Sequence, residues 1–201
     1  MKIIFISGPS GSGKTTLSNR ILLKFKDGIL LSTDNYYKTG LISKILSRFV
    51  QGYFDRSISF NYMLFKKDFN FIIKNGISIC ERSYNFKKKT IKNLLNKKNN
   101  IKFLIVEGIF AKEFSNTFNN QEIFFLELKI DKNVCMNRVL QRDSRERGKD
   151  KNQSKIDFLK SWDIYKEKFK NKFIKKITNE FTITKNTNIE LVLEKIFNLN
   201  S

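Results

Sequence analysis

The sequence contains no histidine, and among its 201 residues only two are cysteine and one is proline. Protein zinc sites use cysteine and histidine, so this composition excludes a zinc centre of that type in practice. Cys80 and Cys135 form no Cys-x-x-Cys pair, and each stands among apolar neighbours. We therefore expect two reduced core cysteines, as in a cytosolic protein. Without histidine, a carboxylate is the natural group to accept a proton near neutral pH.

Long apolar runs are also missing. No segment approaches the roughly 18 apolar residues that a membrane-spanning helix needs, and the apolar run at residues 2–7 is too short for the core of a signal peptide. We expect a cytoplasmic protein without a membrane partner. Hydrophobic residues still make up 40% of the chain, enough for a sizeable core. The length suits one globular domain, residues 1–201, rather than two.

Acidic residues are few: 19 Asp and Glu face 39 Lys and Arg, a formal net charge of +20. Such an excess attracts phosphate groups, including those of nucleic acids. The lysines, however, are spread over the whole chain, and the abundance of Lys, Asn, Ile and Phe is what an AT-rich genome produces. We interpret the charge as compositional and do not predict a nucleic-acid partner.

Apolar runs of strand length alternate with stretches of helical periodicity. The expected strands cover 2–7, 28–33, 101–109, 122–128 and 181–185, and the expected helices cover 15–25, 133–148, 152–176 and 189–197. Strands separated by helices predict right-handed crossovers and an α/β fold, a parallel sheet with helices on both faces. Ligands of such sheets bind at the carboxyl ends of the strands, which brings the loops after residues 7, 34 and 107 to one edge.

The region between the second and third major strands is less regular. Residues 41–75 read as helical in patches, with a break near Gly52. Residues 78–80 and 83–86 read as short strand or hairpin pieces. The lysine-rich stretch at 87–98 is interpreted as a solvated helix face.

The segment "GPSGSGKT" fits the phosphate-binding pattern G-x-x-x-x-G-K-[ST] and lies between an expected strand and an expected helix. Glycines let backbone N–H groups turn inward toward phosphate oxygens, and the helix adds its positive N-terminus. Lys14 is expected to contact the β- and γ-phosphates and Thr15 to bind Mg²⁺. The predicted ATP-binding residues are Gly8, Pro9, Ser10, Gly11, Ser12, Gly13, Lys14, Thr15 and Thr16.

The loop alone does not choose among P-loop enzymes. A GTPase needs an N/T-K-x-D segment, and "TKNT" at 184–187 lacks the aspartate. Motors and helicases need longer chains, which leaves a small-molecule kinase. In "STDNYYK", Asp34 follows the second strand, where a carboxylate faces the γ-phosphate and can accept an alcohol proton. The alternative is that Asp34 only caps the following helix.

Several further segments occur in a characteristic order. They are "GPSGSGKTT", "STDNYYK", "FDRSISFNYMLF" (54–65), "SYNF" (83–86), "VEGIF" (106–110) and "RDSRERGKD" (142–150). Together they make the chain resemble the uridine kinase family, the uridine–cytidine kinases related to phosphoribulokinase. The resemblance implies a P-loop NTPase-type sheet with a nucleoside-binding insertion at about 36–100 and a lid at about 138–155. It also suggests a homo-oligomer.

The resemblance also implies roles for residues on the acceptor side. Asp34 looks like the catalytic base for a ribose 5′-hydroxyl. Asp55 matches the aspartate that holds the 2′- and 3′-hydroxyls, a task that suits a carboxylate because it accepts two hydrogen bonds at once. Tyr84 and Phe86 match the aromatic residues that flank the pyrimidine ring.

On the phosphate side, the resemblance implies that Glu107 orients the magnesium ion through water. Arg142 and Arg147 match lid arginines that close over the triphosphate, where guanidinium groups neutralise charge as the phosphoryl group moves. The implied cofactors are therefore ATP and Mg²⁺, and the implied partner is a small nucleoside.

The chain departs from the family pattern at five positions. Ser57 and Asn61 stand where the family has a proline and a second aspartate, and Asn85 replaces the aspartate of its Y-D-F motif. Lys89 stands where a histidine commonly reads the base, and as a pure donor it suits the uracil O4 carbonyl but not the cytosine amino group. Lys149 replaces the last lid arginine, which keeps the charge but loses the guanidinium fork.

The expected function is ATP-dependent phosphorylation of the 5′-hydroxyl of uridine, with cytidine as a further acceptor, in pyrimidine salvage. One alternative is a related P-loop kinase for nicotinamide riboside, pantothenate or a sugar phosphate. Another is a nucleic-acid-binding relative that has lost catalysis.

Overall fold

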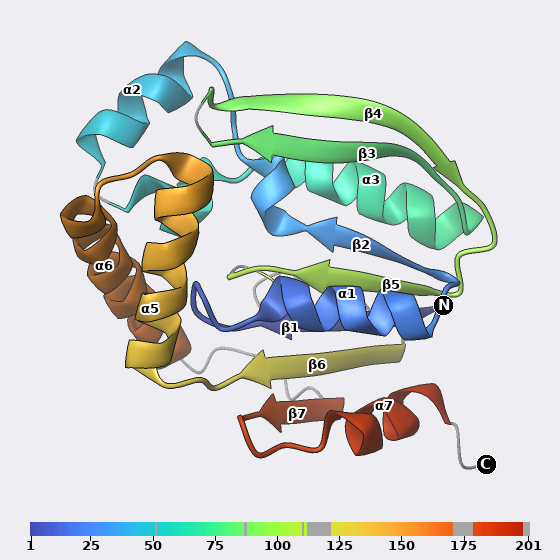
Figure 1. The fold of residues 1–201 in the computed structure, drawn as a ribbon. Coiled ribbons are helices and arrows are strands. Elements are labelled where there is room, and N and C mark those ends of the chain that lie inside the picture. Colours follow the sequence, from blue (N-terminus) through green and yellow to red (C-terminus); the bar gives the residue numbers. More distant parts are fainter. Residues whose placement is uncertain (51, 87, 110, 112–121, 171–178, 199–201) are drawn as a thin grey trace.

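The structure is a computed structural model that describes residues 1–50, 52–86, 88–109, 111, 122–170 and 179–198 (Figure 1). Its centre is a five-stranded sheet in the order β2-β5-β1-β6-β7, and every neighbouring pair is parallel. The strands are β1 (Lys2–Ser7), β2 (Gly28–Ser32), β5 (Phe103–Glu107), β6 (Glu122–Leu128) and β7 (Asn179–Ile183). The predicted α/β fold with a parallel sheet is confirmed.

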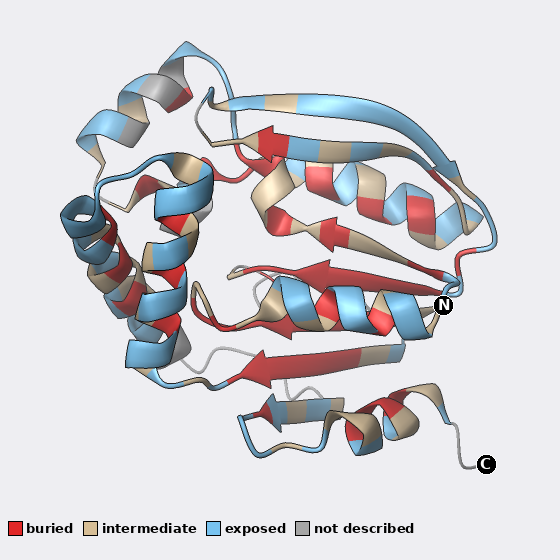
Figure 2. Cartoon of the chain, in the orientation of Figure 1, coloured by how far each residue is buried: buried red, intermediate tan, exposed pale blue. Residues whose placement is uncertain are grey.

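Helices cover both faces of this sheet. One face packs against α3 (Tyr62–Asn75) through a core that includes Phe5, Phe65 and Phe125. The other face packs against α1 (Lys14–Lys24) and α7 (Ile189–Phe197). The central strands are buried almost from end to end (Figure 2), which explains why they read as unbroken apolar runs.

The chain between β2 and β5 forms a lobe, above the sheet in Figure 1, that shares the core beneath α3. In chain order it contains η1 (Thr33–Tyr36), α2 (Leu41–Phe49), η2 (Tyr53–Asp55), η3 (Ser57–Ser59) and α3. It ends in an antiparallel pair of strands, β3 (Ser78–Asn85) and β4 (Thr90–Lys98). The predicted break near Gly52 is confirmed by the end of α2 and the start of η2.

Two expectations for this lobe were wrong. The lysine-rich stretch at 87–98 is not a helix face, because most of it forms strand β4, with Ile91 opposite Tyr84 and Asn93 opposite Arg82. Pairing with β3 satisfies its backbone and overrides the local charge pattern.

The other expectation that was wrong concerns Cys80, which lies on β3 and is only half-buried. Cys135, on the later helix at residues 132–142, is buried as expected.

A helical pair stands at the carboxyl ends of the strands (Figure 1). It consists of α5 (Lys132–Arg142), a π-helical turn η4 (Asp143–Arg147) and α6 (Lys151–Lys170). Asp131 caps α5 by accepting from the N–H groups of Asn133 and Val134. None of the described helices combines the length and apolarity that a bilayer crossing requires. The helix predicted at 152–176 is confirmed as far as Lys170. The rest of the predicted range lies outside the described residues.

At one position of the sheet, Gly28, a neighbouring ring leaves no room for a side chain. A Cβ added to Gly28 would lie 2.1 Å from Cζ of Phe103, whose ring packs edge-on against Phe25 and Phe197 at centroid distances of 6.4 and 5.1 Å. We expect Gly28→Ala to lower the free energy of unfolding by about 1–3 kcal/mol through overpacking, measured by urea denaturation. Gly28→Ala combined with Phe103→Leu should recover part of the loss, and an unchanged single variant would contradict the packing argument.

Candidate active site

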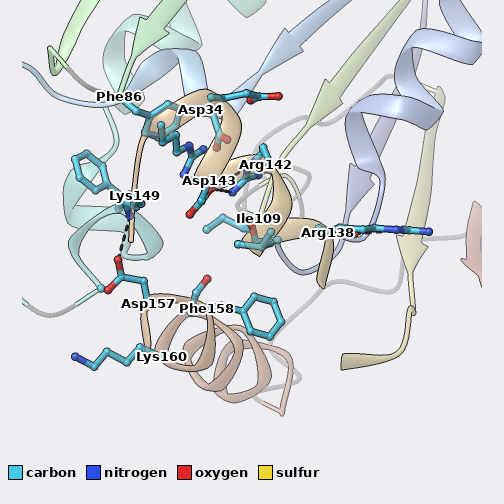
Figure 3. Close-up of a pocket in the computed structure, with 18 of the residues that line it drawn as sticks. Asp34, Phe86, Ile109, Arg138, Arg142, Asp143, Lys149, Asp157, Phe158 and Lys160 are labelled. Carbon is cyan, nitrogen blue, oxygen red and sulfur yellow. Dashed lines mark hydrogen bonds and ion pairs between the residues drawn. The ribbon is translucent and has the colours of Figure 1, made fainter. Parts of the chain in front are cut away.

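A cavity of about 1050 Å³ opens at the carboxyl edge of the parallel sheet (Figure 3). Its wall comes from the glycine-rich loop and α1, the turn after β2, the lobe between β2 and β5, the loop after β5, and the α5–α6 pair. This is the edge at which the sequence predicted the loops after residues 7, 34 and 107 to meet, and the structure brings them together.

The glycine-rich loop has the backbone shape of a phosphate cradle. Gly11 and Gly13 have left-handed φ angles of 79° and 96°, and a Cβ on Gly11 would lie 2.4 Å from the carbonyl oxygen of Cys135. The first-turn N–H groups of α1 have no intrahelical acceptors, and Gly13 at the N-cap offers them no side-chain acceptor. These groups and the helix dipole form a site for an anion.

All nine predicted ATP-binding residues belong to this loop and the start of α1. Those that line the cavity are Ser10, Gly11, Gly13, Lys14, Thr15 and Thr16. Ser12 is buried beneath the loop, and the carbonyl oxygens of Gly8 and Pro9 accept hydrogen bonds from Lys14 Nζ at 3.0 and 2.9 Å. Burial lowers the pKa of Lys14, and the nearby carboxylates of Glu107 and Asp34 oppose that shift.

Thr15 and Glu107 form a compact set of oxygen ligands. Thr15 Oγ1 donates to the two carboxylate oxygens of Glu107 at 3.2 and 3.3 Å. Burial raises the pKa of Glu107, and the Lys14 ammonium opposes the shift. In the described part of the chain no three His, Cys, Asp or Glu side chains gather into a metal site. A hydroxyl and a single carboxylate fit Mg²⁺, which keeps several waters and takes substrate phosphates as further ligands.

Asp34 lies in η1, directly after β2, and its half-buried carboxyl group lines the same cavity as the loop. The hydroxyl of Tyr37 donates to its Oδ1 at 3.2 Å. Sequence reasoning missed Tyr37, because its contact with Asp34 depends on the extended backbone that follows η1.

Three aromatic side chains from the lobe form an aromatic wall of the cavity: Tyr53, Phe54 and Phe86. Tyr84 is buried behind Phe86, with ring centroids 5.0 Å apart, and burial raises its pKa to about 12. Within the described residues its hydroxyl has no hydrogen-bond partner. Lys89 lines the cavity from a backbone with a φ of 51°.

Asp55 is the last residue of η2 and directly follows Phe54 in the sequence. Its side chain lies outside the part of the chain that the structure describes.

The α5–α6 turn contributes cations that share one carboxylate. Arg142 donates to Asp143 Oδ1 from Nε at 3.1 Å and from Nη2 at 2.9 Å. Nη1 of Arg147 lies 3.5 Å from the same oxygen, and the Asp143 side chain is only 4% exposed. The Arg147 guanidinium also stacks over the Phe86 ring, with Cζ 4.1 Å from its centroid. Lys149 lines the cavity but pairs with Asp157 at 3.0 Å (Figure 3).

Burial lowers the pKa of Arg147, and Arg142 adds to the shift while Asp143 opposes it. Both guanidinium groups thus sit in a partly desolvated turn beside one buried carboxylate. Sequence reasoning had no reason to single out Asp143, because its role depends on how the turn folds back on itself.

Residues 3–189 match the Phosphoribulokinase / Uridine kinase family. The chain belongs to this family. It is 32% identical over 151 residues to a uridine kinase from Borrelia duttonii, covering 74% of this chain and 70% of that protein. A uridine kinase from Staphylococcus epidermidis is also 32% identical, over 154 residues that cover 73% of this chain and 70% of that one.

Solved structures support the fold. A D-glycerate 3-kinase from Cryptococcus neoformans var. grubii superimposes with a TM-score of 0.57 and 13% identity, over 90% of this chain and 85% of that one. A structure described as a possible uridine kinase from Bacillus stearothermophilus gives a TM-score of 0.55 and 17% identity, over 89% and 87%. At these identities the likeness concerns the fold alone. Family membership identifies a small-metabolite kinase of the P-loop type, a phosphotransferase.

The shared carboxylate of Asp143 makes a testable contribution to stability. Asp143→Ala leaves two guanidinium groups facing each other without their anion, so we expect a loss of about 1–3 kcal/mol in the free energy of unfolding, measured by urea denaturation. Asp157→Ala is the matched control, since it breaks the more exposed pair with Lys149 and should cost less than about 1 kcal/mol. Equal losses in the two variants would argue against a special role for the buried carboxylate.

Proposed function

We propose that this kinase transfers the γ-phosphate of ATP to the 5′-hydroxyl of uridine, with cytidine as a second acceptor, and so produces nucleoside monophosphates for pyrimidine salvage. The observation that carries the proposal is that the glycine-rich loop, Asp34 and an aromatic wall line one cavity. The identity to proteins named uridine kinase supports the choice of acceptor.

The loop residues bind the triphosphate in this proposal. The loop's backbone N–H groups, which Pro9 lacks, and the N-terminus of α1 hold its oxygens, and Lys14 turns from the loop carbonyls to the β- and γ-phosphates. Thr15 and Glu107 hold Mg²⁺, which neutralises phosphate charge when bound. Arg142 and Arg147 add positive charge from the α5–α6 turn, and residues 138–155 serve as the lid.

Asp34 acts as the base. The 5′-oxygen forms a bond to the γ-phosphorus while the bond from that phosphorus to the β–γ bridging oxygen breaks, and ADP leaves. The hydroxyl proton passes to the Asp34 carboxylate and from there to solvent. Phosphoryl transfer depends mainly on positioning and charge neutralisation, so an ordinary carboxylate is a sufficient base.

Residues 36–100 bind the acceptor in this proposal. Phe86 and Tyr84 flank the pyrimidine ring, since flat bases stack well on aromatic side chains, and Asp55 holds the ribose hydroxyls. Lys89 donates to the uracil O4 carbonyl and Lys149 contributes charge near the donor.

A second candidate function follows from the charge near the acceptor. Arg48 and Lys89 line the cavity on this side, and two cations there would suit an acceptor that carries a carboxylate or a phosphate, such as pantothenate or a sugar phosphate. Nicotinamide riboside belongs to the same alternative as a nucleoside-like acceptor.

An acceptor panel separates these functions. With ATP and Mg²⁺, we expect kcat/KM for uridine to exceed that for pantothenate, nicotinamide riboside or ribulose 5-phosphate by at least about tenfold, measured by coupled ADP release. Turnover of one of these acceptors without turnover of uridine would favour the second function. No turnover at all, with tight and steeply salt-dependent DNA binding, would indicate the inactive nucleic-acid-binding relative.

The base is tested by Asp34→Asn, which removes the proton acceptor but keeps the side-chain shape. We expect kcat to fall by about 10²–10⁴-fold, with the Kd for ATP changed by less than about twofold. Glu146→Gln is the matched control, because Glu146 lines the same cavity and loses the same charge. Near-normal turnover of Asp34→Asn would refute the assignment.

A further inference from the structure

Tyr37 joins the aromatic wall of the cavity to Asp34. Its side chain is only 3% exposed, and its hydroxyl donates to Asp34 Oδ1 at 3.2 Å. Its ring meets Phe54 and Tyr84 edge-on at centroid distances of 5.1 and 5.2 Å and Phe86 at 6.0 Å. One side chain therefore contacts both the acidic group and the rings that face the acceptor side.

The backbone around Tyr37 is held from both directions. A β-bridge pairs Tyr37 with Phe60, the N–H of Lys38 donates to Ser59 O at 2.6 Å, and the N–H of Asn61 donates to Tyr36 O at 2.7 Å. With its backbone fixed and its ring edge-packed on three sides, the tyrosine has one orientation available. The position of its hydroxyl is therefore set by the lobe rather than by the turn that carries Asp34.

A second link ties the same turn to the hairpin. Asn35 Oδ1 accepts from the backbone N–H of Tyr84 at 3.0 Å. Asn35 thus ties the turn to β3, and Asp34 lies between this residue and the end of β2. A carboxylate in such a turn still has rotational freedom about its side-chain bonds, which only a direct contact removes.

We propose that Tyr37 is a positioning residue for Asp34. Its hydroxyl holds Oδ1, which leaves Oδ2 to accept the proton of the acceptor alcohol. Because Tyr37 packs against Phe54 and Phe86, both of which line the cavity, an acceptor that fits the aromatic wall also keeps the carboxylate in place. The inference rests on the proposed function, since it needs Asp34 to act as the base.

A simpler interpretation is that Tyr37 is a core tyrosine whose hydroxyl needs a partner. The neighbouring Tyr36 offers a matched comparison for that interpretation. It is 2% exposed, and its hydroxyl also donates to a carboxylate, Asp68 Oδ2, at 3.1 Å, in a cluster with Arg82. The two tyrosines are adjacent and equally buried, but only Tyr37 is bonded to Asp34.

The first test compares Tyr37→Phe with Tyr36→Phe, using the full chain and the acceptor that gives the highest turnover. We expect Tyr37→Phe to lower kcat by about 10- to 100-fold, because a freely rotating base is seldom aligned, while KM for ATP changes by less than about twofold. Tyr36→Phe should lower the melting temperature at least as much and leave kcat within about twofold. Equal kcat values in the two variants would overturn the inference.

The second test asks whether Tyr37 acts through Asp34. In a double-mutant cycle measured by single-turnover kinetics, the effect of Tyr37→Phe should shrink to less than about threefold in the Asp34→Asn background. A full additional loss there would overturn the inference while leaving the base intact. Normal turnover of Asp34→Asn alone would instead remove the proposed base, so failure of the proposed function is recognised separately.

Discussion

The site depends on the register with which β5 pairs with its two neighbours. Glu107, the last residue of β5, stands opposite Ile6 of β1 and Ser32 of β2. The next residues along β1 form the glycine-rich loop, and those after β2 lead into the turn that carries Asp34. A Cβ on Gly108 would lie only 1.8 Å from Thr33 Oγ1, so the two strand ends lie in close contact. A slip of one residue would turn the Glu107 side chain to the other face of the sheet, so this register sets where Glu107 stands beside the loop and the Asp34 turn.

Burial and charge pairing oppose each other at that edge. Burial lowers the pKa of Lys14 and raises that of Glu107, and in each case the partner's charge counteracts the shift. Each charge therefore offsets part of the cost of burying the other, which is the usual condition for buried ions. The hydrogen bonds from Lys14 to the loop carbonyls and from Thr15 to Glu107 supply the remaining polar contacts. These contacts hold Lys14, Thr15 and Glu107 against the loop.

The sequence predicted the sheet, the loop and the placement of Asp34 and Glu107, because buried parallel strands and a phosphate loop carry strong local patterns. It failed at β4, where lysines mask a strand that exists only through pairing with β3. It also missed Tyr37 and Asp143. Their contacts involve ordinary residues whose partners are set by a short turn and by packing of distant rings. Local patterns do not record such contacts.

The contact between Arg147 and Phe86 links the two halves of the cavity. It joins the α5–α6 turn to the lobe that holds the aromatic wall. A cation–π contact contributes about 0.5–2 kcal/mol, and stacking of a base on an aromatic ring contributes about 1–3 kcal/mol. If a pyrimidine stacks on Phe86 as proposed, it exchanges one contact for another of similar strength and releases Arg147. The guanidinium already lines the cavity and is paired with Asp143, so loss of the ring contact would let it turn further toward phosphate charge when an acceptor is in place. That order would favour transfer to the acceptor over transfer to water.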